Sequence, residues 1–395
     1  MAVRFLAREV SDMCLGKPQL RPLPISASVS DALSALRTTG ESSVSVWKCE
    51  HSSPKKTANL DSCRCVGKVC MVDIICFLCR EDNLSSPSIA LQAPISDLIG
   101  NNARLVKHLD PHSRLSEAID CILDGAQNLI IPIDNKLSKS RNKQPTTTLH
   151  NGQEFCWLTL EDVVRFILNS IGVFSPVSAM SIDSLHIIDP HVMTIHYEEP
   201  ASSALNYISR SLIEQKSVAV VDEHIRIIGE ISPNTLGCCD KTVAAAISTL
   251  SAGDLTSYID YGGPPEDLVR LVKVTLKEKK LEGMYLMMEE ISTSSRTTAT
   301  TSGCSSSSDD KIGLVRRNGG TGRYPQKMRR SEAIICHPWS SLVAVMVQAL
   351  AHRMSHVWVV GEDHCLLGIV TFYGILHVFR NIARHKPEGE TSFRL

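Results

Sequence analysis

Thr159 and Asp162, three positions apart, have the side chains best suited to hold a small polar ligand. They stand where a strand-like run ends and an amphipathic helix is predicted to begin. A hydroxyl beside a helix N-terminus can meet phosphate oxygens together with backbone amides. A carboxylate one turn later can accept hydrogen bonds from both hydroxyls of a ribose. The same residues can instead cap their own helix, where the threonine contributes about 1 kcal/mol and the aspartate roughly 0.3–1 kcal/mol.

The elements that would position this pair belong to a unit that occurs four times in the chain. Each copy has a helix whose apolar residues recur at i, i+3, i+4 and i+7, which places them on one face toward a core. These sets are Val29, Ala32, Leu33 and Leu36; Leu115, Ala118, Ile119 and Ile122; Ala201, Ala204, Leu205 and Ile208; and Leu342, Val345, Met346 and Ala349. A short β segment precedes each helix, and two strand-like runs and a second helix follow it.

One copy is too small to bury a sheet by itself. We therefore expect the copies to pack in pairs, sheet against sheet. Polar insertions interrupt the first two copies at about residues 50–62 and 135–153. Such insertions concentrate at exposed hairpin tips, because the flanking strands still pair without them.

The fourth copy shows the pattern most clearly, in Ser355 to Val360 and in Gly368 to Thr371. An apolar helix, an apolar strand and a glycine-led strand ending in threonine, in this order, resemble the CBS domain, which is named after cystathionine beta-synthase. The resemblance is strongest to plant stand-alone proteins of four divergent CBS repeats, and it extends to the gamma subunit of AMP-activated kinase. It implies an α/β (α+β) fold in which four β-α-β-β-α repeats pack as two pairs, called Bateman modules.

The resemblance also implies a division of the chain. The expected ranges are CBS repeat one at 5–80, repeat two at 92–170, repeat three at 180–237, an insertion at 238–330, repeat four at 331–380 and a tail at 381–395. The first half of the insertion has helical periodicity. Ile291 to Asp310 is rich in serine and threonine and is predicted to be disordered. Lys311 to Arg330 has seven basic and no acidic residues, and is either a docking arm for an acidic partner or a solvated linker.

In the CBS family, nucleotides bind in the cleft between paired repeats, at a hydroxyl and a carboxylate that correspond to Thr159 and Asp162 here. Repeat one keeps the carboxylate as Asp73 but has Cys70 in place of the hydroxyl. The second module keeps its hydroxyls without the carboxylate, with Ser232 and Thr235 in repeat three and Thr371 and Gly374 in repeat four. Repeat two therefore has the complete pair.

The resemblance further implies basic residues at the phosphate end of the cleft, between the first helix and its strand. Repeat four has His352, Arg353 and His356 there, and the other three repeats have one basic residue, Lys216. A phosphate buried without cationic or amide partners carries a large desolvation cost. The candidate nucleotide-binding residues, divided between the two modules, are Thr159, Asp162, Asp73, Cys70, Thr371, His352 and Arg353.

Four cysteines of repeat one form the candidate metal site of this sequence. Cys63 and Cys65, with Cys76 and Cys79, could supply four thiolates. The second pair falls in a predicted helix, however, and zinc favours compact cysteine pairs on loops, so we expect buried thiols and no metal site. The sequence has no Gly-x-Ser-x-Gly, Walker, HExxH or Gly-x-Gly-x-x-Gly motif and no evident nucleophile with a base. We therefore predict that the protein is not an enzyme.

Composition limits the partners. The formal net charge is -1, so we expect no nucleic acid or anionic membrane as a partner. No uncharged apolar run reaches the ~18 residues of a membrane span, and the buried cysteines suggest a reducing compartment. The expected location is the cytoplasm, with the nucleus, or the peroxisome through the terminal Arg394 and Leu395, as alternatives.

The leading hypothesis is a regulatory protein that requires no cofactor. It would bind AMP, ATP or S-adenosylmethionine in the first module and act on a protein partner, by family analogy a kinase or a redox enzyme. A homodimer is also compatible with the sequence. The alternative is a scaffold that binds no nucleotide, which the missing carboxylates at Thr235 and Gly374 favour.

Overall fold

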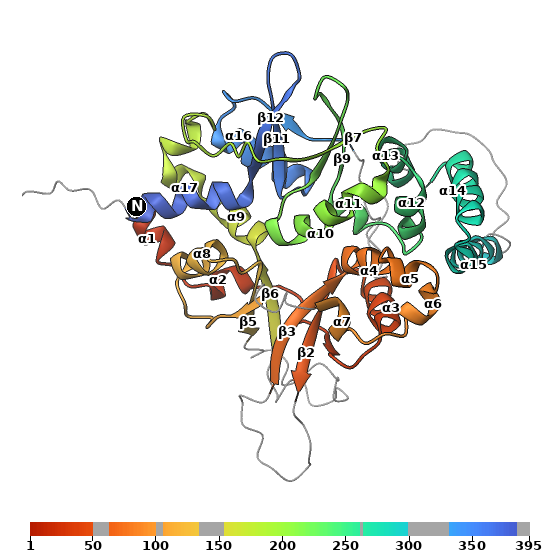
Figure 1. Ribbon diagram of the computed structural model, residues 1–395. Coiled ribbons are helices and arrows are strands. Elements are labelled where there is room, and N and C mark those ends of the chain that lie inside the picture. The colour runs from red at the N-terminus through yellow and green to blue at the C-terminus, as the bar shows by residue number, and fades with distance from the viewer. Residues whose placement is uncertain (50–62, 100–105, 134–153, 261–263, 299–331, 385–395) are drawn as a thin grey trace, which may run out of the picture.

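The computed structural model describes residues 1–49, 63–99, 106–133, 154–260, 264–298 and 332–384 (Figure 1). The expected hairpin tips at 50–62 and 135–153 and the basic tract at 311–330 lie outside these residues.

The described residues form four sheets of three strands each. In every sheet the short first strand runs parallel to the second, and the second runs antiparallel to the third. The strands are β1 (Pro22–Pro24), β2 (Ser43–Cys49) and β3 (Cys63–Cys70); β4 (Val106–His108), β5 (Asn128–Ile133) and β6 (Glu154–Thr159); β7 (Met193–His196), β8 (Val218–Val221) and β9 (Ile227–Ile231); and β10 (Ile335–Cys336), β11 (His356–Val360) and β12 (Leu366–Thr371). The predicted order of elements is thus present four times, and we number the repeats in chain order.

Each repeat has a helix before and a helix after its long hairpin. The first helices are α3 (Val29–Thr39), α8 (Leu115–Leu123), α10 (Leu205–Glu214) with the preceding η5 (Ala201–Ala204), and α16 (Leu342–His352). The second helices are α4 (Met71–Leu78), α9 (Leu160–Leu168), α11 (Pro233–Leu236) and α17 (Phe372–Arg384). Serines cap several of them: Ser28 Oγ accepts the Asp31 amide at 3.1 Å, which satisfies an amide that the helix cannot pair internally.

The sheets pack within pairs, repeat one on repeat two and repeat three on repeat four. Trp47 of β2 lies in one buried cluster with Ile130 of β5. Ala219 of β8 lies in a second cluster with Trp358 of β11. These clusters confirm the predicted sheet-to-sheet pairing.

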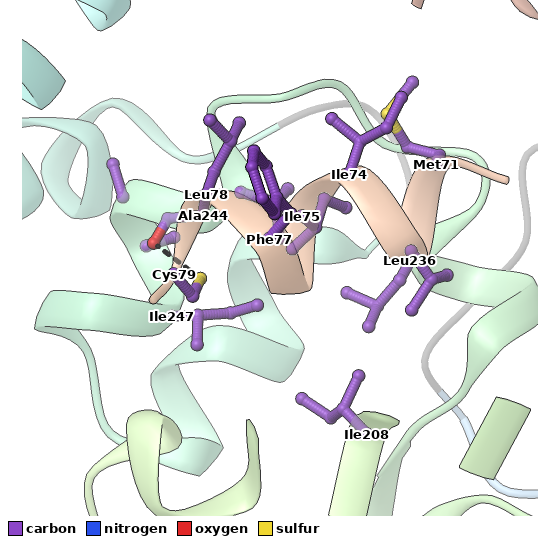
Figure 2. Close-up of a cluster of buried hydrophobic side chains, with 14 of the residues drawn as sticks. Met71, Ile74, Ile75, Phe77, Leu78, Cys79, Ile208, Leu236, Ala244 and Ile247 are labelled. Carbon is purple, nitrogen blue, oxygen red and sulfur yellow. Dashed lines mark hydrogen bonds between the residues drawn. The ribbon is translucent and has the colours of Figure 1, made fainter. Parts of the chain in front are cut away.

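The helices pack across the two pairs instead. One large core joins α3 and α4 of repeat one to α10 of repeat three and to the insertion. The other joins α8 and α9 of repeat two to α16 and α17 of repeat four. Figure 2 shows helix α4 of repeat one in this core together with Leu236 and Ile208 of repeat three. Since a fully buried side chain of this size stabilises the fold by about 1.5–3 kcal/mol, this contact holds the two pairs together.

The insertion adds a helical layer beside repeats one and three (Figure 1). It contains α12 (Val243–Thr249), α13 (Ala252–Ile259), α14 (Glu266–Glu278) and α15 (Glu282–Thr298). The prediction of disorder from Ile291 onward is therefore wrong up to Thr298, because α15 continues to that residue. The rest of the stretch, from 299, lies outside the described residues.

Residues before β1 pack on repeat two rather than on the repeat that follows them. We define the N-terminal arm as Glu9 to Leu20; it includes α2 (Ser11–Cys14) and follows α1 (Ala2–Leu6). Val10 N donates to Ser113 O at 2.9 Å, and Leu20 N donates to Phe155 O at 2.8 Å. The arm therefore lies along α8 and β6.

Short helices α5 (Glu81–Leu84), α6 (Pro87–Ala90) and α7 (Ser96–Ile99) join repeats one and two, and η3 (Ile171–Phe174) and η4 (Val177–Ala179) follow α9. Within the described residues, no helix is both long enough and apolar enough to cross a lipid bilayer.

Candidate functional site

Thr159 and Asp162 stand at the junction of β6 and α9, as the sequence predicted. Thr159 Oγ1 accepts the Asp162 amide at 3.2 Å. Asp162 Oδ2 in turn accepts the Thr159 amide at 2.7 Å and the Thr159 hydroxyl at 2.7 Å. This reciprocal capping box holds both side chains at the helix N-terminus. The capping role is therefore present, and it also orients the two groups that a nucleotide would need.

A lysine from the N-terminal arm completes this site. Lys17 Nζ lies 2.5 Å from Asp162 Oδ2, and the two side chains are only 20% and 27% exposed. All of these contacts reach Oδ2, and Oδ1 has no hydrogen-bond partner among the described residues. A cation thus lies beside the hydroxyl and carboxylate of repeat two. Lys17 was not predicted as a site residue, because it precedes repeat one and no local pattern links it to repeat two.

Repeat one presents a more apolar version of the same junction. Asp73 Oδ2 accepts the Cys70 amide at 2.8 Å. Burial raises the pKa of the Asp73 carboxyl, although the bond from Cys70 opposes the shift. Burial also raises the pKa of the Cys70 thiol well above its ordinary value. Burial therefore disfavours the charged form of both groups.

In repeat three the two hydroxyls satisfy each other. Ser232 Oγ and Thr235 Oγ1 are 2.7 Å apart, and Ser232 Oγ accepts the Thr235 amide at 3.0 Å. Both residues are buried. The polar atoms that would meet a ligand here are already paired with each other.

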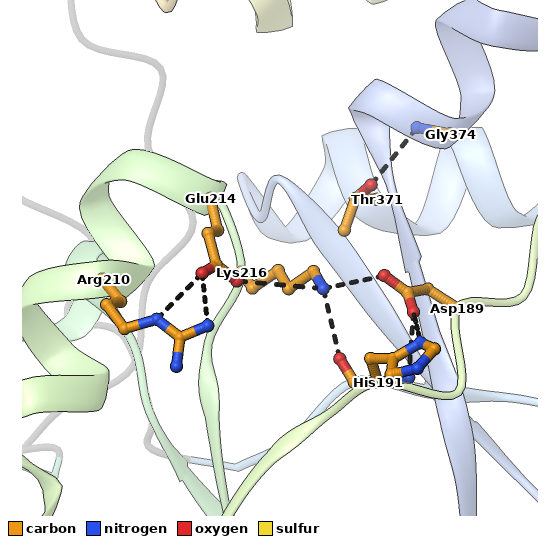
Figure 3. Close-up of polar contacts among 7 residues, drawn as sticks. All are labelled: Asp189, His191, Arg210, Glu214, Lys216, Thr371 and Gly374. Atoms are coloured by element: carbon orange, nitrogen blue, oxygen red, sulfur yellow. Dashed lines mark hydrogen bonds and ion pairs between the residues drawn. The ribbon is translucent and has the colours of Figure 1, made fainter. Parts of the chain in front are cut away.

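In repeat four, Thr371 caps the following helix, and the lysine drawn near it, Lys216, is paired with the carboxylate of Asp189 (Figure 3). Thr371 Oγ1 accepts the Gly374 amide at 3.2 Å. Lys216 Nζ lies 2.7 Å from Asp189 Oδ2, and Asp189 pairs through its backbone with Ile369 on β12. Burial alone would raise the pKa of Asp189, but the hydrogen bond and charge of Lys216 hold that pKa below its usual value.

The basic stretch of repeat four does not form one cluster. His352 and Arg353 are exposed, and their side chains make no hydrogen bond or ion pair within the described part of the chain. His356 is buried instead, with Nε2 at 2.9 Å from Glu230 Oε2. Trp358 Nε1 donates to the same oxygen at 2.7 Å. The expectation that His356 faces a phosphate is therefore wrong, because its ring lies between the sheets of repeats three and four.

Glu230 was not predicted as a functional residue either. It is a fully buried carboxylate on β9. The available signal was an acidic residue inside an apolar strand, between Gly229 and Ile231. A buried charge requires a partner, and here the partners come from repeat four.

Known proteins share this arrangement over nearly the whole chain. The CBS domain-containing protein CBSX5 of Arabidopsis thaliana is 44% identical over 96% of this chain and 98% of that protein. The chain belongs to the CBS-domain family. The CBS domain-containing protein CBSX6 of the same plant is 26% identical over 95% of this chain and 94% of its own length. No protein-family model matches the sequence.

Two further similarities are to a relative of lower identity and to a solved structure. The SNF1-related protein kinase regulatory subunit gamma-like PV42b of Arabidopsis thaliana is 19% identical over 96% of both chains. The crystal structure of protein MJ1225 from Methanocaldococcus jannaschii, proposed to be an archaeal homologue of g-AMPK, superposes with a TM-score of 0.54 at 15% identity. That likeness covers 94% of this chain and all of the archaeal one. It supports the assignment of four CBS repeats in two Bateman modules.

Cys76 and Cys79 of repeat one pack in its hydrophobic core. Cys76 and Cys79 belong to α4 or its end, and burial raises the pKa of the Cys76 thiol to about 12. Cys79 Sγ donates to Ala244 O at 3.5 Å. Among the residues that the structure describes, no three or more His, Cys, Asp or Glu side chains gather in a way that could hold a metal ion.

Proposed function

We propose that this CBS-domain protein is a non-catalytic regulatory protein that binds an adenosine-type ligand at Thr159 and Asp162 and modulates a protein partner. The observation that carries the proposal is the group of Thr159, Asp162 and Lys17 at one helix N-terminus. The amides and dipole of α9 favour an anion at that place. Asp162 Oδ1 is available to a ribose hydroxyl, and Lys17 Nζ supplies the cation that a phosphate needs.

The ion pair between Lys17 and Asp162 does not exclude a ligand at this junction. A partly exposed pair of this kind contributes about 0–1 kcal/mol, so a ligand can exchange it at small cost. The ribose would take over the carboxylate while Lys17 turns to the phosphate. AMP, ATP and S-adenosylmethionine share the adenosine moiety that this exchange requires, and they differ in the charge that Lys17 would meet.

The packing of the helices offers a route from the cleft to a partner. Helix α9, which begins at the proposed site, packs in one core with α16 and α17 of repeat four. A ligand that binds one packing arrangement more tightly than another shifts the population between them. The printed name of the PV42b relative, a gamma-like kinase regulatory subunit, makes a protein kinase the first partner to test.

The test is titration of the purified chain with AMP, ATP and S-adenosylmethionine by calorimetry and thermal shift. A ligand of the native state raises the melting temperature with its concentration. Asp162→Ala should abolish the shift. Asp31→Ala is the matched control, because Asp31 forms the same capping box with Ser28 outside the cleft. Equal binding by wild type and Asp162→Ala would refute the proposed site.

The second candidate is a scaffold that binds no nucleotide. The specific observation in its favour is that the polar groups of the second module are paired with one another, as in the contact of Ser232 with Thr235. A titration without any shift in melting temperature, combined with capture of a partner by both wild type and Asp162→Ala, would support the scaffold.

A further inference from the structure

A cavity lies between the first helix of the chain and two helices from different modules. Helix α1 packs on α17 of repeat four, and α17 packs along α8 of repeat two (Figure 1). The cavity that these helices line has a volume of about 230 Å³. That volume corresponds to roughly eight water molecules at about 30 Å³ each. The space therefore fits a compact organic molecule rather than a nucleotide.

One part of the cavity wall is apolar. Leu6 of α1 and Ile119 of α8 line it and are almost fully buried, whereas Val3 lines it and is 55% exposed. Ala7, at the end of α1, adds a small exposed side chain. A hydrocarbon group bound here would cover apolar surface that now meets water, which is favourable.

The other part of the wall is cationic. Arg380 Nε lies 2.5 Å from Asp120 Oδ1, and the two terminal nitrogens of Arg380 have no partner among the described residues. Arg114 also lines the cavity; its side chain is exposed and makes no ion pair with any residue that the structure describes. Two guanidinium groups against one carboxylate leave one excess positive charge at the cavity.

The cationic wall is held in place before any ligand arrives. Tyr373 Oη donates to Leu123 O at 2.7 Å, and Arg380 contacts Asp120 further along the same two helices. These contacts fix α17 along α8 at two points. A ligand therefore meets an arginine whose position is already determined, which reduces the entropy cost of binding.

We propose that this cavity binds a small organic monocarboxylate with a short hydrocarbon body. Its carboxylate accepts hydrogen bonds from Arg114 and from the terminal nitrogens of Arg380, because a guanidinium donates two parallel bonds to a carboxylate. Its hydrocarbon body packs on Leu6 and Ile119. A single negative charge balances the excess positive charge, whereas a phosphate dianion would exceed it beside Asp120.

This site is separate from the proposed nucleotide site. Lys17, Thr159 and Asp162 do not line the cavity. On the side of repeat four, Arg380 stands nine residues after Thr371, which is roughly 13 Å along the helix axis. The proposal therefore does not depend on the binding of AMP, ATP or S-adenosylmethionine.

The test is titration of the purified full-length chain with benzoate and with hexanoate at constant ionic strength, followed by calorimetry. Both carboxylates should bind saturably at one site per chain. Benzamide has nearly the shape of benzoate without its charge, and it should bind at least about tenfold more weakly, because hydrogen bonds to charged groups are the stronger ones. Inorganic phosphate, as the second anion, should also bind more weakly than benzoate.

Two variants locate the site. Arg114→Gln removes one cation and should weaken benzoate binding about tenfold or more. Ala7→Leu fills the cavity from an exposed position, so the chain should still fold and should lose the binding. The matched control is Arg37→Gln, since Arg37 is an exposed arginine on α3, the corresponding first helix of repeat one. That control should bind benzoate as the wild type does.

No saturable binding of either carboxylate would overturn the proposal, and so would equal binding by wild type, Arg114→Gln and Ala7→Leu. Tighter binding of phosphate than of benzoate would overturn the assignment to carboxylates. Titration in the presence of saturating AMP distinguishes the two sites: displacement of benzoate by AMP would contradict their separation. Benzoate binding by a chain that does not bind AMP would support the cavity and refute only the nucleotide site.

Discussion

The strand-to-helix junctions of repeats two and four have the same local structure but different polar neighbours. In both, a threonine at the end of a strand caps the following helix, and a lysine lies nearby. In repeat two, Lys17 contacts the carboxylate of the site itself. In repeat four, Lys216 pairs with Asp189, which is not on the capped helix, and Gly374 stands in place of the carboxylate. The comparison teaches that a strand-end hydroxyl alone does not make a site, because its neighbours decide whether polar atoms remain for a ligand.

The contact between the two sheets of a module is also more polar in the second module than in the first. The first module packs Trp47 and Ile130 into a mainly apolar cluster. The second module contains the buried carboxylate Glu230 between His356 and Trp358. A buried charge with hydrogen-bonded partners is costly to disturb. The contact between the sheets therefore depends on a buried carboxylate in the second module and on apolar packing in the first.

The largest expected effect is from removal of this buried carboxylate. Glu230→Ala leaves His356 and Trp358 without their acceptor and should destabilise the protein by about 3–5 kcal/mol. Glu230→Gln keeps an oxygen acceptor and should cost less. Urea unfolding of both variants measures the difference. A cost below about 1 kcal/mol for the alanine variant would contradict the assigned role.

A smaller loss of stability is expected from replacing the buried tryptophans of the two modules, Trp358 and Trp47. Trp358 Nε1 donates to a carboxylate at 2.7 Å, and Trp47 Nε1 donates to the Ser45 hydroxyl at 2.9 Å. Both side chains are fully buried. Hydrogen bonds to charged groups contribute about 1.5–3 kcal/mol and neutral ones about 0.5–1.5 kcal/mol. Trp358→Phe should therefore destabilise more than Trp47→Phe in the same urea experiment, and the reverse order would break the comparison.

The smallest effects concern pH. The raised pKa of Asp73 means that the native state holds its proton more tightly, so stability falls as pH rises from the ordinary aspartate pKa through the raised value. The lowered pKa of Asp189 has the opposite sign, and its contribution is lost as pH falls through the lowered value. Asp73→Asn and Asp189→Asn should each flatten one of these slopes in melting temperatures measured across acidic pH. Identical profiles for both variants and wild type would refute the assignment.

Much of the fold could be predicted because its signals are local. The apolar spacing of Leu115, Ala118, Ile119 and Ile122 defines one face of a helix, and α8 buries all four residues. The junction at Thr159 and Asp162 was likewise visible from residue type and spacing. Disorder from Ile291 was predicted wrongly up to Thr298. Composition reports how little apolar surface a segment can bury, and helix propagation from the preceding apolar residues can still extend into it.

The sequence by itself determined the four repeats, their helices and strands, and the one junction that keeps both polar groups. These features depend on periodicity over a few residues, which a linear pattern contains. Only the tertiary structure decided that Lys17 meets Asp162 and that Glu230 meets His356. Each of these contacts joins separate repeats, or the N-terminal arm and repeat two. Such pairs are set by the packing of whole elements, because no local preference of the chain specifies which distant side chain will arrive beside them.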